Sequence, residues 1–189
     1  MKTLNLYIIE KLHLDKKIKI EASYEPTSKE ELIDAVKEVI ANAKKKRDID
    51  FNCIDTSKVN DMSSIFSTVC KDLNIKIYKI NVSSWDTSNV TTMKNMFSGC
   101  KYLETDVSSW DVGNVTDMTG MFMGCERFEG KGIENWNISK VERFIGTFAG
   151  CENLDCNLSS WDVSNFTPTN KKWMLSRVPL KKESFPKGY

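Results

Sequence analysis

The chain has 189 residues, of which 40% are hydrophobic, and a net charge of +1. This length and hydrophobic content allow a folded core, and the balanced charge argues against a nucleic-acid partner. No apolar run approaches the roughly 18 residues of a membrane span. Residues 1–10 lack a secretory-signal pattern, so we expect a cytoplasmic protein with reduced thiols.

The first 49 residues differ in pattern from the rest of the chain. Ser28 and Glu31 form a capping-box pattern, which predicts a helix that continues to about Lys46. Apolar residues follow at helical spacing: Leu32, Val36, Val39, Ile40 and Ala43. A short strand is expected at residues 18–20. We interpret residues 1–49 as a helical cap over the open end of a repeat array, with a separate docking module as the alternative.

A motif recurs every 25 or 26 residues between residues 50 and 167. Trp-Asp begins at Trp85, Trp110 and Trp161, and Trp136-Asn137 occupies the remaining position. A degenerate unit begins at Ile54. Fixed self-similarity at this period predicts an α/β solenoid of about four stacked units.

Apolar residues follow each tryptophan at offsets of five, eight, twelve, fifteen and eighteen residues. Spacings of three and four predict one short helix per unit, and the stretch before each tryptophan predicts one short strand. The repeated core positions are Trp85, Trp110, Trp136, Trp161, Phe97, Phe122, Phe148, Cys100, Cys125 and Cys151. Burial of the tryptophans is favoured because Ile54 substitutes for one of them, and an aromatic platform displayed on the surface is the alternative.

The cysteines and acidic residues do not form a recognisable metal site. There is no Cys-x-x-Cys pair, and the lone histidine is His13, far from the repeat cysteines. The Asp-x-x-Asn segments have the composition of turns, and their spacing does not match a calcium loop. We therefore expect no metal and no cofactor.

Residues 168–189 form the end of the chain and contain three of its four prolines. Trp173, Met174 and Leu175 are expected to cover the last repeat. The remainder is expected to be a loosely held tail.

The repeat resembles that of the BspA-like leucine-rich repeat proteins. The pattern Ser-Ser-Trp-Asp-x-x-Asn-Val-Thr-x-Met-x-x-Met-Phe-x-Gly-Cys begins at Ser83 and again at Ser108. The resemblance implies a right-handed solenoid with a strand ladder on one face. Members of that family are typically bacterial surface proteins that bind other proteins.

These patterns favour a non-enzymatic scaffold that binds a protein partner. No nucleophile in the repeats has a histidine partner, and no glycine-rich phosphate loop is present. The candidate contact positions flank the tryptophans: Ser83, Ser108, Glu134 and Ser159. The alternative is a phage-encoded virion component or small effector, because residues 6–12 resemble the openings of some small phage-encoded proteins of gut bacteria. In that case the protein would be virion-associated.

Overall fold

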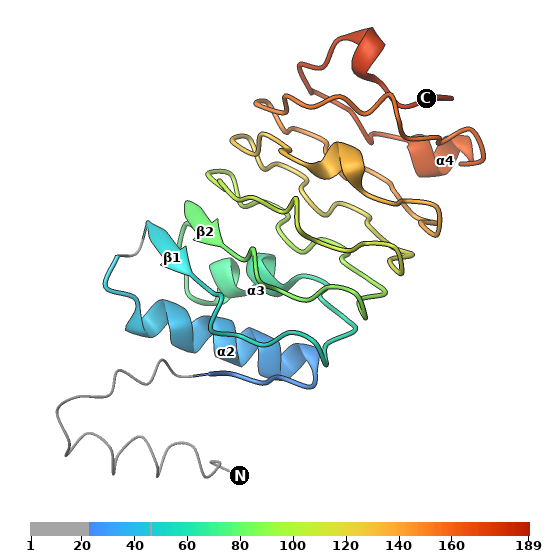
Figure 1. The fold of residues 1–189 in the computed structure, drawn as a ribbon. Coiled ribbons are helices and arrows are strands. Elements are labelled where there is room, and N and C mark those ends of the chain that lie inside the picture. The colour runs from blue at the N-terminus through green and yellow to red at the C-terminus, as the bar shows by residue number, and fades with distance from the viewer. Residues whose placement is uncertain (1–22, 46) are drawn as a thin grey trace, which may run out of the picture.

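The computed structural model describes residues 23–45 and 47–189, which wind through successive turns stacked along one axis (Figure 1). Helix α2 (Lys29–Asn42) lies at one end of the stack. Helix α4 (Pro168–Lys171) and the C-terminus lie at the other end. No described helix is long and apolar enough to span a membrane.

The capping box predicted for α2 is present. The Ser28 Oγ accepts a hydrogen bond from the Glu31 amide at 3.2 Å, and the Glu31 carboxylate accepts one from the Thr27 amide at 2.7 Å. The helix ends at Asn42 and not near Lys46, because Ala43 is extended and leads the chain toward the first strand. The helix buries an apolar face and packs against α3 (Ile65–Asp72); the buried residues are Leu32, Ala35, Val36 and Ile40.

Regular strands occur only in the first two turns of the described chain. Strand β1 (Asp48–Asp50) pairs in parallel with β2 (Lys79–Asn81), with Ile49 opposite Ile80. Later turns are joined by isolated parallel bridges: Lys79–Glu104, Thr92–Asp117 and Asp117–Arg143. Only the Lys79–Glu104 bridge lies in the stretch before a tryptophan, where a strand was expected. The other two bridges lie seven residues after a tryptophan, so the prediction of one strand per unit was wrong for the described units after β2.

The expected helix is present only in the first unit, as α3. From Trp85 onward the same segment forms consecutive β-turns, because two of its residues have left-handed backbone conformations, such as Asn95 (φ 54°) and Gly99 (φ 77°). Alternate amides of these turns bond to the next turn of the stack. The Asn95 amide donates to the Thr119 carbonyl at 2.9 Å. The prediction of one helix per unit was wrong for these units.

The apolar repeat positions lie inside the stack. Four phenylalanine rings stack in single file with centroids 4.9, 5.4 and 5.9 Å apart: Phe66, Phe97, Phe122 and Phe148. The four tryptophans are between 2 and 5% exposed, so they are core residues and not a displayed platform. Three of them donate their Nε1–H to a carbonyl of the preceding turn at 3.0–3.2 Å: Trp85 to Phe51, Trp110 to Val82 and Trp136 to Val107.

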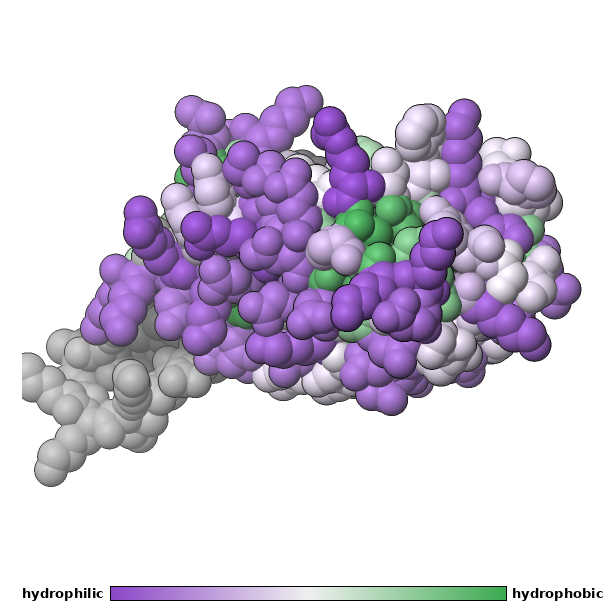
Figure 2. All heavy atoms as spheres, turned by 90° about the horizontal axis from the view of Figure 1, so that it is seen from above, coloured by the Kyte–Doolittle hydropathy of each residue, from purple (hydrophilic) through white to green (hydrophobic). Residues whose placement is uncertain are grey.

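The last 22 residues are attached to the final repeat. Lys187 forms a parallel bridge with Asp162. The Leu158 amide donates to the carbonyl of Ser184, the last residue of the 3-10 turn η2 (Lys182–Ser184), at 2.9 Å. This pairing corrects the expectation of a loose tail. Seen from above, the main hydrophobic area of the molecule is surrounded by hydrophilic side chains (Figure 2).

Candidate protein-binding surface

The predicted contact residues lie in turns that precede the tryptophans. The three serines are exposed, and each amide donates to a side-chain oxygen two residues earlier at 2.9–3.3 Å: Ser83 to Asn81, Ser108 to Asp106 and Ser159 to Asn157. Glu134 lies in the 3-10 turn η1 (Ile133–Asn135). The same turns are linked across repeats, because the Ser109 Oγ donates to the Ser83 carbonyl at 2.7 Å. Turn geometry therefore accounts for serine at these positions.

A different surface exposes large apolar side chains. Trp173 is 58% exposed and Met123 is 45% exposed. Both line a hollow of about 430 Å³ on the β-turn side of the stack; the other lining residues are Asn95, Thr119, Gly120, Ile145, Gly146, Ala149 and Ser176. The hollow therefore spans several consecutive repeats.

The backbone of the stack fixes the position of Trp173. The carbonyls on either side of it, from Lys172 and Met174, accept the amides of Gly146 and Phe148 at 3.2 and 3.0 Å. Trp173 thus occupies the left-handed position that Gly146 fills one repeat earlier, with φ of 63°. A bulky residue in this conformation is strained, and such strain is concentrated at functional sites.

Basic residues adjoin the residues that line the hollow. The Lys172 ammonium lies 5.5 Å from the centre of the Trp173 ring. The charged residues adjacent in sequence to the lining residues are all basic and exposed: Lys94, Lys172 and Arg177. The hollow thus combines apolar walls with positive charge at its edge.

A second surface carries a stack of aromatic and basic side chains. The rings of Tyr78 and Tyr102 are stacked with centroids 5.2 Å apart. The Arg47 guanidinium lies 4.9 Å from the Tyr78 ring centre, and that of Arg127 lies 5.6 Å from the Tyr102 ring centre. Arg127 also forms an ion pair with Glu104 at 3.3 Å. The tyrosine rings and the arginine side chains thus contact partners within the chain. We therefore interpret this stack as a contact that joins neighbouring repeats.

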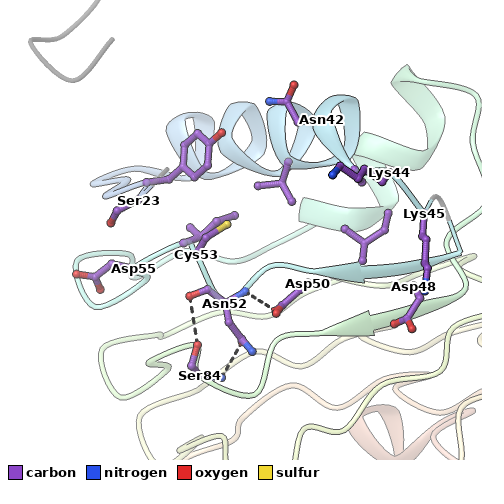
Figure 3. A pocket seen from close by; sticks show the side chains of 15 residues that line it. Ser23, Asn42, Lys44, Lys45, Asp48, Asp50, Asn52, Cys53, Asp55 and Ser84 are labelled. Atoms are coloured by element: carbon purple, nitrogen blue, oxygen red, sulfur yellow. Dashed lines mark hydrogen bonds between the residues drawn. The ribbon is translucent and has the colours of Figure 1, made fainter. Parts of the chain in front are cut away.

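Another hollow, of about 890 Å³, lies between α2 and the first repeat (Figure 3). Asn52 lines this hollow. The backbone amide of Asn52 donates to Asp50 Oδ1, and Asn52 Oδ1 accepts a hydrogen bond from the backbone amide of Ser84, both at 3.0 Å. Ser23 lines this hollow, and the residues before it lie outside the described range. We therefore assign this hollow no ligand.

The aspartates that follow the tryptophans act in turns. Asp86 accepts hydrogen bonds from the hydroxyl and amide of Ser88, at 2.7 and 2.9 Å, and these bonds lower the pKa of its carboxyl group. The corresponding bonds from Ser164, with a contribution from Lys187, lower the pKa of Asp162 to about 2. Within residues 23–45 and 47–189, no group of three or more His, Cys, Asp or Glu side chains is arranged to hold a metal ion.

The sequence analysis missed the exposure of Trp173. It predicted that residues 173–175 cover the last repeat, and Met174 and Leu175 are indeed buried. The available signal was the register: Trp173 follows Gly146 by about one repeat, at a position occupied by glycine or asparagine in the three preceding units. The strand expected at residues 18–20, His13 and the phage-like segment 6–12 lie outside the described residues.

Comparison with known proteins connects these repeats to a family. No curated protein gives a significant match, and no solved structure does so. A family model matches residues 34–131 and again residues 71–183, and the match is consistent with the BspA-like resemblance of the repeats. Because these two segments together cover most of the sequence, the chain belongs to the family described as Mycoplasma protein of unknown function, DUF285.

Proposed function

We propose that this protein is a non-enzymatic, protein-binding scaffold built as a BspA-like solenoid, and that a partner binds at the hollow between Met123 and Trp173. The observation that carries this proposal is the exposure of Trp173, 58%, in a strained left-handed conformation at the edge of that hollow. The other four tryptophans of the chain are buried.

The composition of the hollow is that of a protein interface. Tryptophan and methionine are enriched in interface cores, and tryptophan is among the commonest residues that dominate binding energy. A volume of about 430 Å³ accommodates a large apolar side chain together with part of its backbone. Stacked repeats hold the walls rigidly, which limits the entropy lost on binding.

The charges around the hollow define the chemistry of the partner. Lys94, Lys172 and Arg177 are exposed cations next to the lining residues. Electrostatic complementarity at an interface favours the opposite charge on the partner and increases the association rate. The expected ligand is an acidic peptide segment with one large apolar side chain.

Synthetic peptides test this proposal directly. The probe is a peptide of about twelve residues with a central leucine between glutamates, compared with matched peptides in which serine replaces leucine or lysines replace the glutamates. Binding is followed by the change in total tryptophan fluorescence, which we expect to come from Trp173, the one tryptophan exposed among the described residues. We expect only the leucine-glutamate peptide to bind, and to bind more weakly as the salt concentration rises.

Substitution then locates the site. Trp173→Ala should weaken binding about thirtyfold or more, measured by calorimetry, because truncating a central tryptophan typically costs about 2 kcal/mol or more. Tyr189→Ala is the matched control, because Tyr189 is also exposed, 47%, and does not line the hollow. Equal binding by Trp173→Ala and the unsubstituted protein, or preference for the lysine peptide, would refute the proposed site.

A further inference from the structure

Two cysteines of neighbouring repeats are in direct contact. The Sγ atoms of Cys70 and Cys100 lie 3.9 Å apart. Cys70 lies in α3 and is half-buried, whereas Cys100 is buried, with 3% of its surface exposed. Of this pair, Cys70 is therefore the thiol that solvent reaches more readily.

The later repeat cysteines have different partners. The thiols of Cys125 and Cys151 donate to the carbonyls of Phe97 and Phe122 in the preceding turn, both at 3.1 Å. Cys100 occupies the same repeat position, but the turn before it is the helix α3, in which backbone carbonyls accept hydrogen bonds from amides four residues later. In the structure the Cys100 thiol contacts Cys70 instead.

We propose that Cys70 and Cys100 form a reversible disulfide when the protein meets hydrogen peroxide. The Cys70 thiolate attacks one peroxide oxygen and releases hydroxide, which leaves a sulfenic acid on Cys70. The Cys100 sulfur then attacks the Cys70 sulfur, the S–O bond breaks, and water leaves as Cys100 loses its proton. One peroxide is reduced and two thiols are oxidised.

The ionisation of the thiols supports this order of reaction. The hydrogen bond from Cys100 lowers the pKa of Cys70, which increases the fraction of nucleophilic thiolate. Burial raises the pKa of Cys125, and it raises that of Cys151 to about 12, so both remain protonated at neutral pH. The hydrogen bond with Cys70 and burial also raise the pKa of Cys100, so attack on peroxide is directed to Cys70.

The disulfide would fasten α3 to the following repeat. It closes a loop of about thirty residues, between positions 30 apart in sequence, and so restricts the unfolded chain. Thioredoxin-class reductants would reverse it, as they do for most disulfides of reducing compartments.

Peptide mapping tests the site. The full chain is reduced, freed of reductant and titrated with hydrogen peroxide; the remaining thiols are then alkylated and the tryptic peptides are analysed by mass spectrometry. We expect a cross-linked pair joining Cys70 to Cys100, with loss of two hydrogens and full recovery of both thiols after dithiothreitol. Cys125 and Cys151 should remain alkylated throughout.

Two variants control for non-specific oxidation. In Cys70→Ser, a conservative change at a half-buried site, no Cys100 cross-link should form, whereas Cys125→Ser should cross-link like the unsubstituted protein. The oxidised unsubstituted protein should also melt roughly 5 °C or more above its reduced form, and Cys70→Ser should show no such shift. Recovery of Cys70 as an over-oxidised sulfinate with Cys100 still alkylated would overturn the proposal, as would equal cross-linking of Cys70 to Cys156.

Discussion

Trp161 differs from the three tryptophans before it in the hydrogen bonding of its indole. Its indole Nε1 is buried and has no hydrogen-bond partner among the described residues, whereas Trp110 donates to the Val82 carbonyl at 3.1 Å. The repeat from Trp110 to Trp136 is one residue longer than its neighbours, 26 residues, and the 3-10 turn η1 lies at its end. A buried donor without an acceptor costs about 1–3 kcal/mol.

Phenylalanine substitution should reveal this difference. Trp110→Phe and Trp161→Phe remove the same ring atoms, but only the first removes a hydrogen bond. Both variants should lower the free energy of unfolding, and the loss in Trp161→Phe should be smaller than that in Trp110→Phe by about 1 kcal/mol or more. Urea unfolding followed by circular dichroism measures both, and equal losses would contradict the assignment of Trp161 as unsatisfied.

Truncation to alanine separates the core tryptophans from the displayed one. Trp110→Ala should lower the free energy of unfolding by roughly 3–5 kcal/mol, because it opens a large cavity beside Phe97. Trp173→Ala should change it by about 0.5 kcal/mol or less, because the ring is largely in solvent and alanine keeps the same left-handed backbone. Chemical denaturation of both variants checks the prediction; a comparable loss in Trp173→Ala would argue against display.

Asp162 makes the stability of the folded protein depend on pH in the acidic range. Its pKa is about 2 in the folded protein against 3.8 for the ordinary group, so the unfolded chain binds the proton more readily. The contribution of Asp162 is present above pH 4 and is lost as the pH falls toward 2. Asp162→Asn should flatten this part of the stability curve measured by urea unfolding. It should also keep the turn, since Asn137 makes the same bond to Ser139 at 3.2 Å. An unchanged slope would contradict the prediction.

At the scale of the element, two glycines with the same backbone conformation differ in how closely a neighbouring turn approaches them. Gly99 and Gly132 have nearly the same φ, 77° and 81°, but a methyl group on Gly99 would meet no atom within 4 Å, whereas one on Gly132 would overlap the Cα and Cβ of Ser108. The first position requires only the left-handed backbone. The second also holds two neighbouring turns in contact.

Alanine at these glycines should therefore have unequal effects. Gly99→Ala should cost about 1–2 kcal/mol of unfolding free energy from backbone strain alone. Gly132→Ala should cost roughly 1–3 kcal/mol more, because Ser108 and its turn must move. Thermal and urea denaturation of the two variants test this difference, and similar losses would show that the turns are not in contact at Ser108.

Individual side-chain contacts could be predicted from the sequence more reliably than the secondary structure of each repeat. The capping box of Ser28 and the apolar file of Phe97, Phe122 and Phe148 could be predicted, because side-chain chemistry and period define them locally. The repeat helices could not, because spacings of three and four also suit stacked β-turns. Asn95, in the middle of the supposed helix, was the missed signal, and its left-handed conformation depends on bonds to the next turn.

The candidate site was less predictable than the fold. Ser83, Ser108, Glu134 and Ser159 were chosen because they flank the tryptophans, and the three serines are explained by local turns. Trp173 could not be identified from its own segment, because its exposure follows from the bonds that Gly146 and Phe148 make across the repeat boundary.

At the scale of the whole molecule, both ends of the stack are closed by chain outside the regular repeats. Tyr24 forms a parallel bridge with Ile54 beside α2 at one end, and Lys187 pairs with Asp162 at the other. Stacked repeats derive stability from their neighbours, so an uncovered end would expose the apolar file. These caps leave the sides of the stack available for a partner.

The central claim is that successive repeats lie directly on one another and share one apolar file. Nuclear Overhauser spectroscopy of the labelled protein tests it through the ring protons of three phenylalanines. With ring centroids 5.4 and 5.9 Å apart, Phe122 should give cross-peaks to both Phe97 and Phe148, and these two should give none to each other. Absence of the Phe122 cross-peaks in a folded sample, or a direct cross-peak between Phe97 and Phe148, would contradict the stacking.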